Sequence, residues 1–355
     1  MRSTSLTFLQ RLLDAPGPSG FETAPAKIWR DEAATIADDV TADVSGNSAA
    51  VLNGAGAPRV MFAGHIDEIG LMVSHVDEDG FLAFQAIGGW DPQVLVGQRV
   101  VIATRSGPVA GVIGRKPIHL LKAEDKEKAI KITDLWIDIG AKHQKDAQKR
   151  VRVGDPAVVA AAALPLPNQR LASRSIDNRI GAFVVLEALR LLRRPRPKAA
   201  VHAVATAQEE IGWFGGGART SATGLEPAVA IVVDVTHATD HPNADKKEVG
   251  DIRLGAGPVL SRGSAVNPVV FELLAETAGR EKIPYQIQAA PRDTGTDADA
   301  IATAHRGVAT GLVSVPNRYM HSPNEMVDLA DVERTIRLLA AFARRVTTKT
   351  DFTPR

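Results

Sequence analysis

The chain has 355 residues, of which 45% are hydrophobic and 23% are charged, the composition of an ordinary globular protein with enough length for two domains. Its 42 basic and 41 acidic residues give a formal net charge of +1, so the charge balance favours neither nucleic acid nor an anionic membrane as a partner. The chain contains no cysteine, which excludes disulfides and thiolate metal sites and leaves His, Asp and Glu as candidate metal ligands.

The sequence also lacks the signals of secretion and membrane insertion. No apolar run reaches the roughly 18 uninterrupted residues typical of a membrane-spanning helix. Residues 1–9 lack the apolar core and small-residue cleavage site of a signal peptide. We therefore expect a cytoplasmic protein with neither a membrane nor a nucleic-acid partner.

Two helices and a buried strand are predicted first along the chain. Leucines from Leu6 to Leu13 recur at helical spacing, and the prolines and glycines of residues 15–20 end that helix. A second amphipathic helix is predicted over residues 22–37. The apolar run 59–64 then predicts a short buried strand.

A candidate metal ligand follows this strand directly. His65 and Asp67 are two residues apart, so in an extended segment their side chains project to the same side. The imidazole of His65 is then suited to bind a metal, with Asp67 holding its other ring nitrogen. A His-x-Asp pair is also common where no metal binds, so this pair alone leaves both interpretations open.

Short β runs dominate the next part of the chain. Residues 71–76 and 81–87 predict a hairpin, because Asp79-Gly80 supplies the positive φ that its turn requires. Further short strands are predicted over residues 99–104, 109–113, 135–139 and 157–163, separated by turns and by charged helical pieces over 122–131 and 141–150. This pattern is typical of a small β-barrel or sandwich inserted into an α/β chain.

The α/β pattern resumes near residue 171. A helix is predicted from Asn178, which places Asp177 at its start, either as an ordinary helix cap or as a carboxylate facing a metal. The apolar strand predicted over 201–206 leads into a glycine-rich turn that carries Glu209 and Glu210. Adjacent glutamates repel each other, so they indicate either a solvated loop or a site with a compensating metal ion.

The remaining apolar runs also end on possible ligands. The run 227–233 ends on Asp234, and His237, Asp240 and His241 follow as rival ligands. The last predicted strand, 311–316, is followed by His321. A closing amphipathic helix is expected, capped by Asp331.

These residues are predicted to converge, because the carboxyl ends of parallel strands share one edge of a sheet. The candidate ligands are two imidazoles and three carboxylates, a donor set suited to a pair of divalent ions such as Zn²⁺, Co²⁺ or Mn²⁺: His65, Asp177, Glu210, Asp234 and His321. Glu209, left off the metals, is expected to take a proton from an attacking water and hand it to the leaving nitrogen.

Five blocks of sequence, in this order, resemble the tetrahedral (TET) aminopeptidases, a family of co-catalytic dinuclear metallopeptidases. The resemblance covers nearly the whole chain and rests on Gly64-His65-Ile66-Asp67-Glu68, Ser175-Ile176-Asp177-Asn178-Arg179, Ala207-Gln208-Glu209-Glu210-Ile211-Gly212, Val233-Asp234-Val235-Thr236-His237-Ala238-Thr239-Asp240 and Arg318-Tyr319-Met320-His321-Ser322-Pro323.

The resemblance implies a role for each matching residue. His65 and Asp234 would bind one metal, Glu210 and His321 the other, and Asp177 would bridge the two. Asp67 would orient His65, and Glu209 would be the general base. Loops at 262–264 and 294–297 are candidate parts of the specificity pocket.

The resemblance also implies an architecture and an assembly. A zinc-peptidase-like catalytic domain, with a mostly parallel sheet flanked by helices, would comprise residues 1–68 and 165–348, followed by a tail over 349–355. Residues 69–164 would form a β-barrel through which two subunits dimerise. Six dimers would close into a hollow dodecamer that admits only short peptides.

Three other functions compete with a metal-dependent aminopeptidase. A related deacylase or carboxypeptidase would use the same metals on N-acyl or carboxy-terminal amides. A β-glucanase acting through Glu209 and Glu210 fits poorly, because glycosidases need carboxyl groups roughly 5 to 10 Å apart across a sugar ring. A non-catalytic assembly of the same fold would have no need of a general base.

Overall fold

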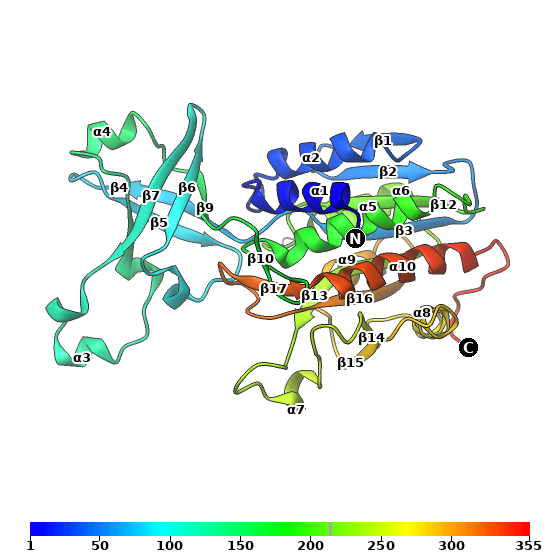
Figure 1. The fold of residues 1–355 in the computed structure, drawn as a ribbon. Helices are drawn as coiled ribbons and strands as arrows, with labels where there is room; N and C mark the ends of the chain where they lie inside the picture. Colours follow the sequence, from blue (N-terminus) through cyan, green and yellow to red (C-terminus); the bar gives the residue numbers. More distant parts are fainter. Residues whose placement is uncertain (213–214) are drawn as a thin grey trace.

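A computed structural model describes residues 1–212 and 215–355 of the chain (Figure 1). Trp213 and Phe214, part of the glycine-rich turn predicted after residue 206, lie outside the described residues. The described chain forms an eight-stranded sheet, a three-stranded sheet and a closed six-stranded barrel. The predicted α/β fold with an inserted β-barrel is therefore confirmed.

The eight-stranded sheet has a parallel centre, in which β12, β3, β13 and β16 are neighbours. Antiparallel strands β2 and β14 flank this centre on its two sides. In sequence order, the strands of the sheet are β1 (Asp39–Ala42), β2 (Ser48–Leu52), β3 (Arg59–His65), β12 (Ala200–Thr206), β13 (Val229–His237), β14 (Val259–Gly263), β15 (Gln286–Ala290) and β16 (Ala309–Asn317).

Both faces of this sheet are buried, which explains why its central strands are almost continuously apolar. On β3, Phe62 packs into the larger core with α1, α2, α5, α8 and α10, whereas Met61 and Ala63 pack into a second core with α6 and α9. The longer helices are α1 (Ser3–Asp14), α2 (Thr23–Ala33), α5 (Ile176–Leu191), α6 (Gly216–Leu225), α8 (Pro268–Arg280) and α10 (Leu329–Arg345), and the short ones are α7 (Lys246–Val249) and α9 (Asp297–Ala302).

The barrel projects to one side of the sheet and has a core of its own (Figure 1). Its strands are β4 (Gly70–Val76), β5 (Leu82–Ile87), β6 (Arg99–Thr104), β7 (Gly107–Arg115), β8 (Leu135–Asp138) and β9 (Pro156–Val159). The charged stretches predicted to be helical over 122–131 and 141–150 form only the short helices α3 (Ala123–Lys126) and α4 (Gln144–Gln148), and single 3₁₀ turns occur at Pro92–Leu95, Ile118–Leu120 and Ile132–Asp134.

The three-stranded sheet pairs the segment that follows the barrel with a strand that precedes the last helix. It consists of β10 (Leu164–Leu166), β11 (Arg170–Ser173) and β17 (Glu325–Asp328). Strand β11 leads into α5, and β17 leads into α10. The N-cap of α10 is Asp328, so the prediction of Asp331 as the cap was wrong: Asp331 accepts the backbone N–H groups of Gly255 and Gly257 instead.

Within the described residues, no helix combines the length and the apolar character that crossing a membrane requires.

Candidate metal centre

The predicted site residues lie at one edge of the sheet. His65 is the last residue of β3, and Glu209 and Glu210 follow the end of β12. Asp234 lies within β13, which continues to His237 rather than ending at Asp234 as predicted. His321 lies on the loop between β16 and β17. Parallel strand order therefore places these side chains together.

Two glycines bring Asp177, in the first turn of α5, close to His65. A Cβ atom on Gly64 would lie 2.5 Å from the carbonyl carbon of Gly181, and a Cβ atom on Gly181 would lie 2.5 Å from the carbonyl oxygen of Val233. Helix α5 can therefore lie directly on β3 and β13 only because both positions are glycine.

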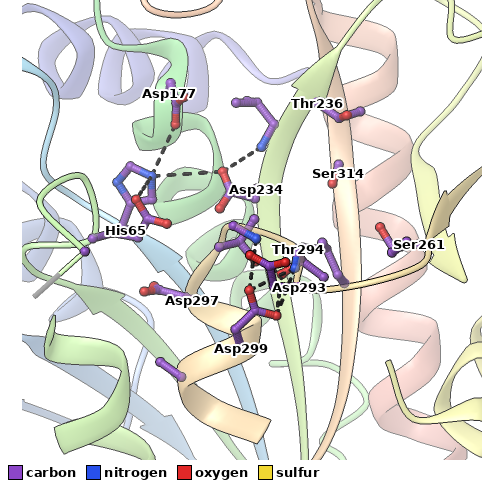
Figure 2. Close-up of a pocket in the computed structure, with 18 of the residues that line it drawn as sticks. His65, Asp177, Asp234, Thr236, Ser261, Asp293, Thr294, Asp297, Asp299 and Ser314 are labelled. Atoms are coloured by element: carbon purple, nitrogen blue, oxygen red, sulfur yellow. Dashed lines mark hydrogen bonds and ion pairs between the residues drawn. The ribbon is translucent and has the colours of Figure 1, made fainter. Parts of the chain in front are cut away.

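Around His65, three carboxylates approach one ring nitrogen. His65 Nε2 lies 3.2 Å from Asp177 Oδ1, 3.7 Å from Glu209 Oε2 and 4.0 Å from Asp234 Oδ1. Figure 2 shows the side chains of Asp177 and Asp234 turned toward the imidazole. His65 is buried, with 1% of its side chain exposed. This group is the first half of the candidate centre.

The second half of the candidate centre is formed around His321. Its Nε2 atom lies 3.4 Å from Asp177 Oδ2 and 3.3 Å from Glu210 Oε2. Asp177 thus directs one oxygen to each histidine. Ligand atoms of His65, Asp177 and Glu210 lie within 4.8 Å of one another, as do those of His65, Glu209 and Asp234. Glu209, which the sequence analysis left off the metals, is thus a member of the second group and lies beside Asp234.

The crowding of carboxylates shifts their protonation. Burial raises the pKa of Glu209 and of Asp234 well above the ordinary values, and the negative charges of neighbouring carboxylates add to this effect. Burial also raises the pKa of Glu210, with Asp177 as the next cause. Hydrogen bonds to Asp177 and Glu210 raise the pKa of His321 to about 11. The cluster therefore favours bound positive charge.

Asp177 and His65 behave differently from these acids. Burial opposes the charge of Asp177, but the two histidines hold the pKa of that carboxyl well below its usual range. Burial likewise disfavours the imidazolium form of His65, yet Asp67 and Glu209 raise the pKa of His65 well above its usual value. The carboxylate between the histidines is thus the most readily ionised of the group.

The donor set fits divalent cations. Buried carboxylates are stable only when paired, hydrogen-bonded or bound to a metal. Glu210 Oε1 is buried and has no hydrogen-bond partner among the described residues. Nitrogen and oxygen donors at this spacing match the ligands preferred by Zn²⁺ and related ions. A metal ion would use donor atoms that the protein itself leaves uncompensated.

Asp67 supports the cluster from behind. Its Oδ1 atom lies 3.3 Å from His65 Nδ1, an ion-pair distance without good hydrogen-bond alignment. The carboxylate also accepts the backbone N–H groups of Glu209 and Glu210 at 3.3 and 3.1 Å and the hydroxyl of Ser19. Asp67 therefore contacts both halves of the candidate centre, and its predicted role of orienting His65 stays a prediction.

Two of the three rival ligands make other contacts, and the third lies beside the site. Asp240 pairs with Arg318 at 2.8 Å, and the Nδ1 atom of His241 lies 3.0 Å from the carbonyl oxygen of Pro242. His237 lines the cavity beside the site. In the described part of the chain, the groups of closely spaced ligand atoms include none of these three residues and do not include His321 either. His321 differs from the three in that its Nε2 atom lies 3.4 Å from Asp177 and 3.3 Å from Glu210.

The cluster opens into a cavity of about 760 Å³. Residues 294–297 line it as predicted, whereas the 262–264 loop does not and only the neighbouring Ser261 does. Asp299, which the sequence analysis missed, holds this loop by accepting the N–H groups of Thr294 and Gly295 (Figure 2). Burial raises the pKa of Asp297 to about 6.

Comparison with known proteins identifies the family of the chain. The family model of the M42 glutamyl aminopeptidases matches residues 46–338. The lysyl aminopeptidase of Pyrococcus furiosus is 37% identical over 349 residues, which cover 98% of each chain.

Solved structures agree with the sequence matches. A TET aminopeptidase from a marine sediment archaeon of the Thaumarchaeota superposes with a TM-score of 0.93 at 34% identity, over 98% of this chain and 97% of that one. The TET1 peptidase of Pyrococcus horikoshii, described as assembling into a tetrahedron or a large octahedral shell, gives a TM-score of 0.86 at 30% identity, over 96% of this chain and 100% of that one.

Proposed function

The chain belongs to the M42 glutamyl aminopeptidase family and is a metal-dependent peptide hydrolase, and from this premise we propose that it removes amino-terminal residues from short peptides at a dinuclear metal centre. The observation that carries the proposal is Asp177, whose two oxygens lie 3.2 and 3.4 Å from the Nε2 atoms of His65 and His321. A carboxylate placed between two imidazoles suits the bridging of two ions.

In this proposal each half of the site holds one ion. His65 and Asp234 hold the first, Glu210 and His321 hold the second, and Asp177 contributes to both. We propose Zn²⁺ or Co²⁺ as the bound ions, with Mn²⁺ as an alternative, because the donors are nitrogen and oxygen. When bound, such ions polarise the scissile carbonyl and make water more acidic.

Glu209 is proposed as the general base. Its carboxylate lies beside both His65 and Asp234 and lines the cavity. It accepts a proton from the attacking water and donates it to the nitrogen of the departing peptide.

We also propose the assembly implied by the relatives. Exposed apolar side chains on or beside the barrel support a contact with a second subunit: Val112, Ile118, Leu120 and Val153. The barrel strands support residues 69–164 as a separate domain, between catalytic segments 1–68 and 165–348 and before the tail 349–355. Light scattering should give the mass of a dodecamer built from dimers, and a monomer mass would contradict it.

A cytoplasmic location stays a prediction that cell fractionation can test.

A substrate panel tests the reaction itself. Aminoacyl anilides and N-acetylated amino acids are offered to enzyme that has been chelated and then resupplied with Zn²⁺, Co²⁺ or Mn²⁺. We expect turnover of the anilides only, and only after a metal is returned. Turnover of the blocked substrates alone would instead identify a deacylase or carboxypeptidase.

A further inference from the structure

Glu325, the first residue of β17, is a buried carboxylate that the mechanism above does not use. Its side chain has no solvent exposure. Its Oε2 atom accepts the backbone N–H of Asp177 at 2.9 Å, and its Oε1 atom accepts the backbone N–H of His321 at 2.8 Å. One side chain thus joins the backbones of two proposed metal ligands that come from different parts of the chain.

The three-stranded sheet explains this placement. Glu325 on β17 pairs with Ser173 on β11, and β11 leads within four residues to Asp177. On its other side, Glu325 follows the loop that carries His321. The carboxylate therefore lies where the start of α5 and the loop after β16 converge.

The backbone of His321 needs such support. Its φ of 58° lies in the left-handed region, which is unfavourable for a residue with a Cβ atom. A hydrogen bond from its N–H to the buried carboxyl group of Glu325 stabilises that conformation. Without this bond, the loop can relax and move the imidazole ring of His321 away from Asp177 and Glu210.

We propose that Glu325 is a positioning residue that sets the distance between Asp177 and His321 and thereby the affinity for the ion held by Glu210 and His321. The proposal rests on the dinuclear centre described above. Glu325 has no direct role in bond breaking, and its effect passes through the geometry of the two ligands. A residue needed only for folding would stabilise the chain without a selective effect on one ion.

Cobalt titration of the full-length chelated protein tests this proposal. Visible absorption reports the coordination geometry of each Co²⁺ equivalent, and elemental analysis counts the ions retained. In Glu325→Gln, the amide NH₂ replaces one acceptor, so one backbone N–H loses its partner. We expect the second Co²⁺ to bind about 10- to 100-fold more weakly, with an altered spectrum, while the first equivalent changes less.

Asp331 offers a matched control. It is also fully buried and also accepts two backbone N–H groups, but these come from Gly255 and Gly257, neither of which is a proposed metal ligand. Asp331→Asn should lower thermal stability and leave both Co²⁺ affinities unchanged. If Glu325→Gln does not fold, Glu325→Asp, whose side chain is one methylene shorter, is titrated in the same way. It should show the same selective loss of affinity for the second Co²⁺.

The outcomes separate this proposal from the function on which it rests. Wild-type protein that binds fewer than two Co²⁺ ions would overturn the dinuclear centre and the positioning role with it. Wild-type protein that binds two, with a Glu325 variant of unchanged affinities and spectrum, would overturn the positioning role alone. Equal weakening in Asp331→Asn would also overturn it, because the effect would then be one of general stability.

Discussion

The two halves of the candidate centre are built differently. His65 and Asp234 belong to neighbouring parallel strands, β3 and β13, and their side chains are 1% and 6% exposed. Glu210 and His321 lie on loops beyond β12 and β16, and the side chain of His321 is 34% exposed. One half thus belongs to the sheet, and the other is only attached to it.

The difference shows where the geometry of each half comes from. Strand hydrogen bonds fix the backbone of His65 and Asp234 without further help. The loop half lacks such a ladder, and buried carboxylates take its place: Asp67 accepts the N–H of Glu210, and Glu325 accepts the N–H of His321. The sheet therefore orders one half, and side chains on other elements order the second.

The largest expected effect is on turnover, and it comes from Glu209, which is proposed to bind neither ion. Glu209→Gln keeps the shape of the side chain but removes its ability to carry a proton. We expect kcat for an aminoacyl anilide to fall by about 10²- to 10⁴-fold, with metal content unchanged by elemental analysis. Retained turnover would remove Glu209 from the role of general base, and lost metal would make it a ligand.

Removing one histidine from each half tests the comparison directly. His65→Ala removes the cationic partner of the buried Asp67 carboxylate, a type of change that costs about 3–5 kcal/mol of unfolding free energy. In His321→Ala, the lost side chain is already 34% exposed, so the free energy of unfolding should fall far less. Calorimetry and elemental analysis should show a destabilised His65 variant with little metal and a stable His321 variant that retains one ion.

Equal losses in the two variants would contradict a difference between the halves. Two ions retained in His321→Ala would point to His237 or His241 as the ligand that replaces it.

The sequence predicted the sheet half of the site better than its supports. Buried parallel strands appear as continuous apolar runs, and the polar residues at their carboxyl ends must share one edge, so His65 and Asp234 could be grouped without a structure. Even there the boundary was wrong at Asp234, because β13 continues past it as far as His237.

The supporting carboxylates gave no such signal. Glu325 and Asp299 act by accepting backbone N–H groups, and such contacts leave no pattern of side chains in the sequence. Ser19 reaches Asp67 from the turn after α1, a contact that depends on how α1 and β3 pack. These roles follow from tertiary structure and need coordinates to be found.

A smaller effect is expected from Asp67, whose carboxylate supports both halves from outside the ligand set. Asp67→Asn keeps one acceptor oxygen but loses the negative charge beside His65. Because Asp67 also accepts the N–H of Glu210, we expect both ions to bind about 10- to 100-fold more weakly. Co²⁺ titration measures this loss. A loss confined to one ion would show that Asp67 supports a single half, and the contrast with the selective Glu325→Gln variant would disappear.

Ser19→Ala should have the smallest effect. Ser19 donates its hydroxyl to Asp67 and touches neither half directly. Losing a hydrogen bond to a charged, buried group costs about 1.5–3 kcal/mol of unfolding free energy, but Asp67 keeps its two backbone donors from Glu209 and Glu210. Metal affinity should therefore fall by less than about tenfold while thermal unfolding shifts measurably. A loss as large as in Asp67→Asn would mean that the hydroxyl, rather than the backbone donors, fixes the orientation of that carboxylate.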